Sequence, residues 1–236
     1  MPAIVPGDDI ARHIARADLR DGDVVVVAQK VVSKAEGRII DLATVVPTAR
    51  AAALGTEIGK DPRIVEAILS EAVRVVRSRP GLLIVEHRLG FVMANAGVDQ
   101  SNVARADGRE LVLLLPDDPD VSAARLRDGL RELTGKTVGV IVSDSFGRAW
   151  RRGTVGIAIG VAGLPALRDM RGKPDLFGRI LEVSIIGYAD EIAAAASLIM
   201  GQAGEGRPVV VVRGLQFEGE GTGQDLVRPA AEDLFR

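Results

Sequence analysis

Hydrophobic residues gather in short unbroken runs, which predict strands buried on both faces. The clearest run is Val24–Ala28 (VVVVA), where β-branched valine dominates. Thr137–Ser143 (TVGVIVS) has the same character and leads directly into polar residues. We expect further strands at Leu82–Glu86, Phe91–Ala94, Leu111–Leu115, Leu181–Ile186 and Pro208–Arg213.

Other segments repeat apolar residues at helical spacing. Ile10, Ile14 and Ala17 share one face of a helix predicted over residues 8–20. The mixture of elements predicts an α/β (mixed α+β) fold in one domain over residues 1–236, without the regular alternation of a doubly wound sheet. We also expect helices at Thr48–Lys60, Pro62–Arg77, Asp120–Leu133 and Ala189–Met200.

Composition narrows the function classes. The 236 residues carry a net charge of −2, which does not fit a nucleic-acid-binding surface. The absence of cysteine excludes disulfides and a cysteine nucleophile and fits a reducing compartment. No apolar stretch approaches the roughly 18 residues of a membrane helix, and the N-terminus lacks the features of a signal peptide. We predict a cytoplasmic protein with no nucleic-acid or membrane partner.

The sequence contains only two histidines. His13 fits a surface position on the first predicted helix, whereas His87 fits either a structural or a site role. With only two histidines in the chain, a histidine triad or a zinc site is not indicated.

A first polar segment, Gln29–Lys34, follows the buried run at Val24–Ala28. Lys30 and Lys34 can hold phosphates or a carboxylate from this position. They can equally be solvated lysines on a loop, because charged side chains are usually exposed.

A second polar segment, residues 94–103, is rich in small and amide side chains. Asp99 and Asn102 offer hard oxygen ligands, and Gly97 would let the backbone approach a ligand closely. An Asx-rich turn explains the same residues without a ligand.

A third polar segment begins at Asp144 and Ser145, where the run to Ser143 ends. Their oxygens suit Mg²⁺ or Mn²⁺, and the arginines at 148, 151 and 152 suit phosphate or carboxylate. A turn with a surface ion pair is the alternative. If this segment converges with the one containing Asp99, the two would form a two-metal site for phosphoryl transfer.

Standard phosphate-binding motifs are missing from the sequence. Gly55–Asp61 resembles a P-loop but is one residue short and lacks the Ser or Thr after the lysine. The glycines at 156, 160 and 163 do not form the dinucleotide-binding pattern. Gly201–Arg207 is a flexible loop that can wrap a phosphate through backbone N–H groups, or can simply connect two elements.

Four segments together resemble the coenzyme F420-0:L-glutamate ligase family, which adds γ-linked glutamates to the deazaflavin cofactor F420. They are VVVVAQKVVSKAEGR (24–38), EHRLGFVMANAGVDQSNV (86–103), IVSDSFGRAWRRG (141–153) and residues 189–214, which contain PVVVVRG. The resemblance implies the family's own mixed α/β fold without a P-loop. It also implies a GTP-dependent ligase with F420-0 and L-glutamate as substrates, two divalent ions per site (Mg²⁺ or Mn²⁺, with K⁺ as a further candidate) and a homodimer.

The resemblance also assigns site residues. Asp99 and Asp144 would hold one metal, and Ser145 and Gln202 the second, where some relatives carry Glu and Glu205 can share the role. Arg148 would act with Asp99 and Asp144 in catalysis. Nucleotide contacts would come from Met1, Pro2, Ala3, Ile4, Gln29, Lys30, Lys34, Asn102, Met200, Gly201, Gln202, Ala203, Gly204, Glu205, Gly206 and Arg207.

The implied reaction proceeds through an acyl phosphate. The F420-0 carboxylate attacks the γ-phosphate of GTP, and the amine of L-glutamate then displaces phosphate to form an amide. Two other functions stay open on the sequence. One is a ligase of the same type acting on another carboxylate, such as a folate, and the other is a non-catalytic subunit that binds a nucleotide or a deazaflavin.

Overall fold

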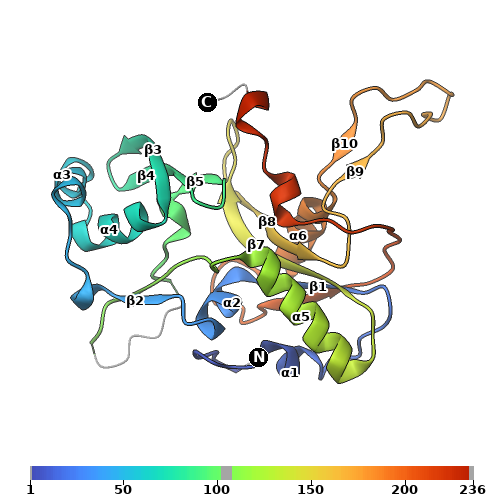
Figure 1. The fold of residues 1–236 in the computed structure, drawn as a ribbon, viewed down its shortest axis with the longest axis horizontal. Helices are drawn as coiled ribbons and strands as arrows, with labels where there is room; N and C mark the ends of the chain where they lie inside the picture. Colours follow the sequence, from blue (N-terminus) through green and yellow to red (C-terminus); the bar gives the residue numbers. More distant parts are fainter. Residues whose placement is uncertain (1, 102–107, 234–236) are drawn as a thin grey trace.

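A mixed sheet in the order β11-β1-β7-β8 forms the centre of the protein (Figure 1). The computed structural model describes residues 2–101 and 108–233. The strands β1 (Val24–Ala28) and β7 (Gly139–Gly147) are parallel, and β11 (Val209–Val212) and β8 (Thr154–Ala162) flank them antiparallel. The predicted mixed α/β fold is confirmed.

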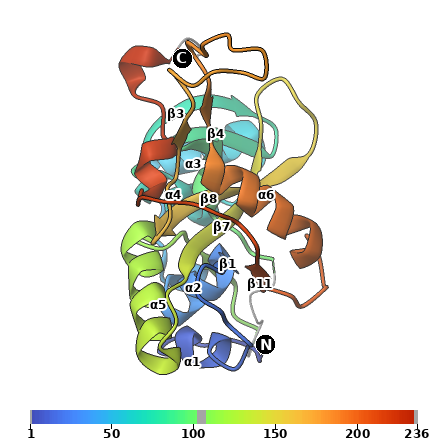
Figure 2. The same ribbon diagram turned by 90° about the vertical axis from the view of Figure 1, so that its right-hand side faces the viewer.

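Helices cover both faces of this sheet. Within Val24–Val27, alternate side chains belong to opposite cores, one against α5 (Pro119–Thr134) and one against α6 (Tyr188–Met200). Both faces of β1 are therefore buried, which explains why its apolar run is unbroken. The α5 face also receives α1 (Ile10–Ile14) and α2 (Gln29–Ala35) (Figure 2).

A smaller lobe, on the left in Figure 1, has its own apolar core. The predicted helix at 62–77 is wrong beyond Ser70, because residues 72–79 pair with the next strand instead. The β-branched valines of this stretch fit a strand better than a helix. The lobe contains α3 (Ala49–Ile58), α4 (Pro62–Ser70), β3 (Ala72–Arg79), β4 (Leu82–His87) and β5 (Val92–Ala94).

The remaining short elements join these parts. β2 pairs with β6 between the lobe and the main sheet, and β9 pairs with β10 in a projecting arm. Their bounds are β2 (Ile39–Asp41), β6 (Leu111–Leu113), β9 (Arg168–Asp169), β10 (Ile185–Ile186), η1 (Leu42–Thr44), η2 (Asn95–Gly97), η3 (Gly223–Leu226) and η4 (Ala230–Glu232).

The segment after β1 differs from the loop considered on the sequence. Residues Gln29–Ala35 form α2, which begins as soon as β1 ends. Val31 and Val32 are buried, and the Gln29 amide donates to Ser33 Oγ at 2.9 Å, one turn along the helix. Tertiary packing thus outweighs the weak helix propensity of two adjacent valines.

β7 is longer than predicted, and Asp144 and Ser145 lie inside it. They pair with Ile157 and Gly156 of β8 instead of forming a turn. Gly156 permits close approach of α6, because a Cβ there would lie 2.7 Å from the carbonyl oxygen of Ala193. The glycine spacing of this region therefore serves helix–sheet packing.

No helix among the described residues is long and apolar enough to cross a membrane.

Candidate active site at the carboxyl end of β1 and β7

The site lies where the two parallel strands of the sheet diverge. Ala28 is level with Ser143, but the chain then turns into α2 on one side and continues as β7 on the other. Ligands of α/β sheets characteristically bind at the carboxyl ends of such strands. A pocket of about 370 Å³ opens here. Its lining includes Pro2, Ala3, Ile4, Gln29, Lys30, Lys34, Asp144, Ser145 and every residue from 200 to 207.

Segments distant in sequence therefore meet at one pocket. The N-terminal strip, α2, β7 and the loop after α6 each contribute residues that the family resemblance assigned. Met1 and Asn102, which were assigned with them, lie outside the described residues.

Lys30, on the first turn of α2, connects the pocket to Asp99. Its Nζ lies 2.5 Å from Asp99 Oδ2 and 2.5 Å from Ser101 Oγ. Ser101 also donates to Asp99 through its backbone N–H at 2.6 Å and its hydroxyl at 2.9 Å. Burial raises the pKa of Asp99, but the hydrogen bonds from Lys30 and Ser101 outweigh it, so the net pKa is lowered. Asp99 is thus a stable carboxylate beside the pocket.

Asp144 is in the opposite electrostatic situation. It is half-buried on β7, and burial raises its pKa to about 6. A hydrogen bond from the backbone of Ser145 and the charge of Lys30 oppose this rise, whereas the charge of Asp99 adds to it. The structure therefore brings Asp99, Lys30 and Asp144 within electrostatic range of one another, and Asp144 has too little positive charge around it.

Ser145 and Gln202 also meet, although 57 residues separate them. The Ser145 hydroxyl donates to Gln202 Oε1 at 2.7 Å. Glu205, the alternative considered for Gln202, instead accepts the backbone N–H of Ala203 at 2.8 Å within its own loop. That bond lowers the pKa of Glu205, and Gln202 is the side chain directed at Ser145.

Gln29 and Lys34 line the pocket in different ways. The Gln29 amide nitrogen donates to Ser33 Oγ and to the carbonyl of Leu114 at 3.2 Å, so it also ties α2 to the core. Burial lowers the pKa of Lys34, and the positive charge of Lys30 adds to this effect. Two lysines one helical turn apart make this wall of the pocket attractive to an anion.

A strained turn places Asp99. Asn95, Ala96 and Gly97 have φ values of +51°, +51° and +68°, and Ala96 is fully buried. The sequence suggests that Gly97 lets the backbone approach a ligand, but Gly97 does not line the pocket. A Cβ at this position would lie 2.8 Å from the Leu115 side chain, so the glycine is required by the core.

Arg148, assigned to catalysis, lies in the β7–β8 turn and does not line the pocket. Its Nη2 donates to the carbonyl of Arg152 at 3.1 Å, which closes the turn. This turn projects from the sheet (Figure 2, yellow) and is exposed throughout residues 147–153.

Sequence reasoning missed two residues here. Ser101 bridges Asp99 and Lys30, and only its spacing of two from Asp99 could have signalled an Asx-type turn. Trp150, the only tryptophan, is 87% exposed with φ +63° at the tip of the β7–β8 turn. A sole tryptophan among arginines was the available signal.

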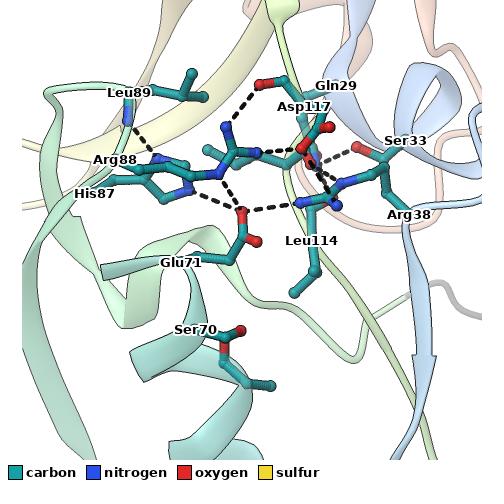
Figure 3. A network of polar contacts seen from close by, with 12 residues as sticks. Gln29, Ser33, Arg38, Ser70, Glu71, His87, Arg88, Leu89, Leu114 and Asp117 are labelled. Atoms are coloured by element: carbon teal, nitrogen blue, oxygen red, sulfur yellow. Dashed lines mark hydrogen bonds and ion pairs between the residues drawn. The ribbon is translucent and has the colours of Figure 1, made fainter. Parts of the chain in front are cut away.

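His87 belongs to a second polar cluster (Figure 3), with Arg38, Glu71 and Arg88, and none of these four residues lines the pocket. Its Nδ1 accepts the backbone N–H of Leu89 at 3.0 Å, so the neutral ring carries its proton on Nε2, 3.4 Å from Glu71 Oε2. Arg38 at 2.9 Å and Arg88 at 3.2 Å reach the same carboxylate oxygen. This cluster joins the α2–β2 connection to the small lobe, which favours a structural role for the fully buried His87.

Comparison with known proteins places the chain in a class. The sequence profile of F420-0:Gamma-glutamyl ligase matches residues 1–214. The chain is similar to the coenzyme F420:L-glutamate ligase of Methanopyrus kandleri, with 49% identity over 98% of this chain and 92% of the relative. Proteins of the same name from Archaeoglobus fulgidus (48%, covering 100% and 93%) and Methanocaldococcus jannaschii (45%, covering 100% and 94%) are also similar.

The family profile and these relatives define the class of the protein as a ligase. The chain belongs to the F420-0:gamma-glutamyl ligase family, which confirms the resemblance found in the four sequence segments.

Proposed function

We propose that this protein forms an amide between the terminal carboxylate of F420-0 and the amine of L-glutamate, driven by GTP, and then extends the product with γ-linked glutamates. The observation that carries the proposal is the arrangement of Asp99, Lys30 and Asp144 beside a pocket lined by two lysines and a glycine-rich loop. Carboxylates, lysines and backbone N–H groups in this arrangement suit a nucleoside triphosphate and its metal ions.

The donor set fits two hard divalent ions such as Mg²⁺ or Mn²⁺. One ion would be held by Asp99 and Asp144, and the second by Ser145 and Gln202. The described residues contain no group of three or more His, Cys, Asp or Glu that could hold an ion alone. This matches Mg²⁺, which typically takes one or two carboxylates and completes its shell with water and substrate phosphates. When bound, the ions would neutralise charge on the β- and γ-phosphates, and K⁺ is a further candidate.

Other residues of the chain would bind and orient the substrates. Lys30 and Lys34 offer positive charge to phosphate oxygens, and the backbone N–H groups of loop 200–207 can wrap the nucleotide. The N-terminal strip at Pro2–Ile4 supplies apolar contact on the same pocket. The carboxylate of F420-0 attacks the γ-phosphate, GDP leaves, and the glutamate amine then displaces phosphate from the acyl phosphate.

The β7–β8 turn is the surface we assign to F420-0. The deazaflavin ring and the reacting carboxylate lie at opposite ends of that molecule, separated by a phosphate-bearing arm. Trp150 offers an exposed aromatic face for the ring, and Arg148, Arg151 and Arg152 offer charge for the arm. Ser145 and Trp150 belong to the same hairpin, so the turn extends directly from the pocket.

A homodimer is part of the proposal. The arm, residues 167–186, projects from the main sheet (Figure 1) and exposes Leu176 and Phe177, each by 92%. Exposed large apolar side chains in a group mark interaction surfaces. Sedimentation should give a dimer mass, and replacing Leu176 and Phe177 together by Asp should give a monomer.

Glutamate-dependent GDP release in the presence of F420-0 tests the function. We expect release with F420-0, L-glutamate and a divalent ion together, and a product heavier by one or more glutamates. GDP release with a folate as acceptor, and not with F420-0, would identify a ligase that acts on another carboxylate. Binding of the nucleotide without turnover would identify a non-catalytic subunit. Either result would overturn the proposal.

A further inference from the structure

The Lys30 ammonium lies where a cation is required. Its Nζ is 2.5 Å from Asp99 Oδ2, and its charge also acts on Asp144. The same two carboxylates repel each other, since the charge of Asp99 raises the pKa of Asp144. Carboxylates that approach closely need a positive charge between them or near them. In this chain that charge is supplied by a lysine.

A divalent ion and the Lys30 ammonium compete for Asp99 Oδ2. The ion needs direct contact with the oxygen at roughly 2.0–2.2 Å, whereas Lys30 already donates a hydrogen bond to it. Asp99 Oδ2 also accepts the Ser101 hydroxyl, so an ion that binds this oxygen displaces the lysine. The four-carbon stem of a lysine is flexible enough to permit this.

The displaced ammonium has a defined place to go. Lys30 lines the pocket together with Lys34, one turn further along α2. Only 29% of the Lys30 side chain is exposed, so it lies along the pocket wall and does not extend into solvent. An anion in the pocket would receive Lys30 as soon as Asp99 releases it.

We propose that Lys30 occupies the metal position on Asp99 until a divalent ion arrives, and that the ion transfers the Lys30 ammonium from Asp99 to the nucleotide phosphates. This rests on the proposed function, because it assumes metal and nucleotide binding at this pocket. Lys30 is then a positioning residue that couples the two binding events. By linkage, each ligand strengthens the binding of the other by the same factor.

Calorimetric titration of the nucleotide-free protein with Mn²⁺ tests the first half. Lys30→Met should bind Mn²⁺ about tenfold more tightly than wild type, because the ion no longer displaces a charge-assisted hydrogen bond. The matched control is Lys34→Met, which removes the same charge from the same helix without a contact to Asp99, and it should change the affinity by less than about threefold. Unchanged or weaker Mn²⁺ binding by Lys30→Met, or equal tightening in both variants, overturns the proposal.

Titration with GDP, with and without saturating Mn²⁺, tests the transfer. In wild type, Mn²⁺ should strengthen GDP binding, and in Lys30→Met this enhancement should shrink by about tenfold. Lys34→Met should weaken GDP binding by a similar factor in both conditions. An undiminished enhancement in Lys30→Met overturns the transfer. Failure of wild type to bind Mn²⁺ and GDP at all would overturn the proposed function together with it, which is a distinguishable result.

Discussion

Two carboxylates in this protein, the buried Glu71 and the partly buried Asp144, have opposite electrostatics. Glu71 contacts His87, Arg38 and Arg88 (Figure 3), whereas Lys30 is paired with Asp99 and acts on Asp144 only through its charge. Burial raises the pKa of Glu71, but the neighbouring His87 and the two guanidinium charges outweigh it and lower the pKa to about 2. For Asp144 burial prevails, and the pKa rises to about 6.

The difference distinguishes a structural cluster from the proposed ligand site. A carboxylate whose partners all come from the chain is satisfied and stabilises the fold. One with too few partners costs free energy in the ligand-free protein, and strongly perturbed groups of this kind cluster at functional sites. The comparison predicts that the two carboxylates respond to mutation in opposite ways.

The largest expected effect concerns activity at Asp144. Asp144→Asn should reduce glutamate-dependent GDP release by about 10³-fold, because a charged ligand at the phosphoryl-transfer site is lost. In EDTA the free energy of unfolding of Asp144→Asn should be about 1–3 kcal/mol higher than that of wild type. The reason is that a neutral amide costs less to bury than the poorly compensated carboxylate of Asp144.

Both readouts bear on the comparison. Near wild-type release by Asp144→Asn would remove Asp144 from the metal site. A lower free energy of unfolding would show that its carboxylate is satisfied like that of Glu71. Asp169→Asn, on the exposed arm, serves as the activity control.

The next effect concerns stability at Glu71. Glu71→Gln leaves Arg38 and Arg88 with the exposed Asp117 as their one shared carboxylate, so the free energy of unfolding should fall by about 3 kcal/mol in urea titrations. GDP release per folded molecule should stay within about twofold of wild type, since the cluster does not line the pocket. A loss of turnover without a loss of stability would reverse the roles assigned to the two clusters.

Protonation of Glu71 should contribute to the loss of stability at low pH. Its folded-state pKa of about 2 lies below the ordinary 4.5, so its contribution is complete above about pH 4.5 and is lost as the pH falls toward 2. The difference in unfolding free energy between wild type and Glu71→Gln should therefore narrow across this window. A difference that is constant from pH 6 to 2 would contradict the assignment.

The smallest effect is expected at an exposed ion pair. Arg12 contacts Asp9 at 2.9 Å, but their side chains are 74% and 50% exposed. Arg12→Gln should change the free energy of unfolding by less than about 0.5 kcal/mol in the same urea titrations. A change comparable to that of Glu71→Gln would show that burial does not explain the contrast between the clusters.

Much of the fold could be predicted from local pattern. The buried strands at Val24–Ala28 and 139–143 and the helices α3, α5 and α6 follow from unbroken or periodic apolar residues. Two predictions that were wrong or incomplete, at Gln29–Ala35 and 72–79, involve segments whose valines can serve in either element. The helix predicted over 8–20 is limited to Ile10–Ile14, and the strand predicted at Leu181–Ile186 to Ile185–Ile186. Only tertiary partners decide between the two.

The sequence by itself determined which residues can do chemistry and, through four segments, the family to which the chain belongs. The tertiary structure alone decided that Lys30 pairs with Asp99 close enough to act on Asp144 through its charge, and that Ser145 meets Gln202. It also decided that the charge of Glu71 is compensated by its neighbours while that of Asp144 is not. The physical reason is that chemistry type is a property of each side chain. Charge compensation depends on strand register and on packing between residues tens of positions apart, which no local pattern encodes.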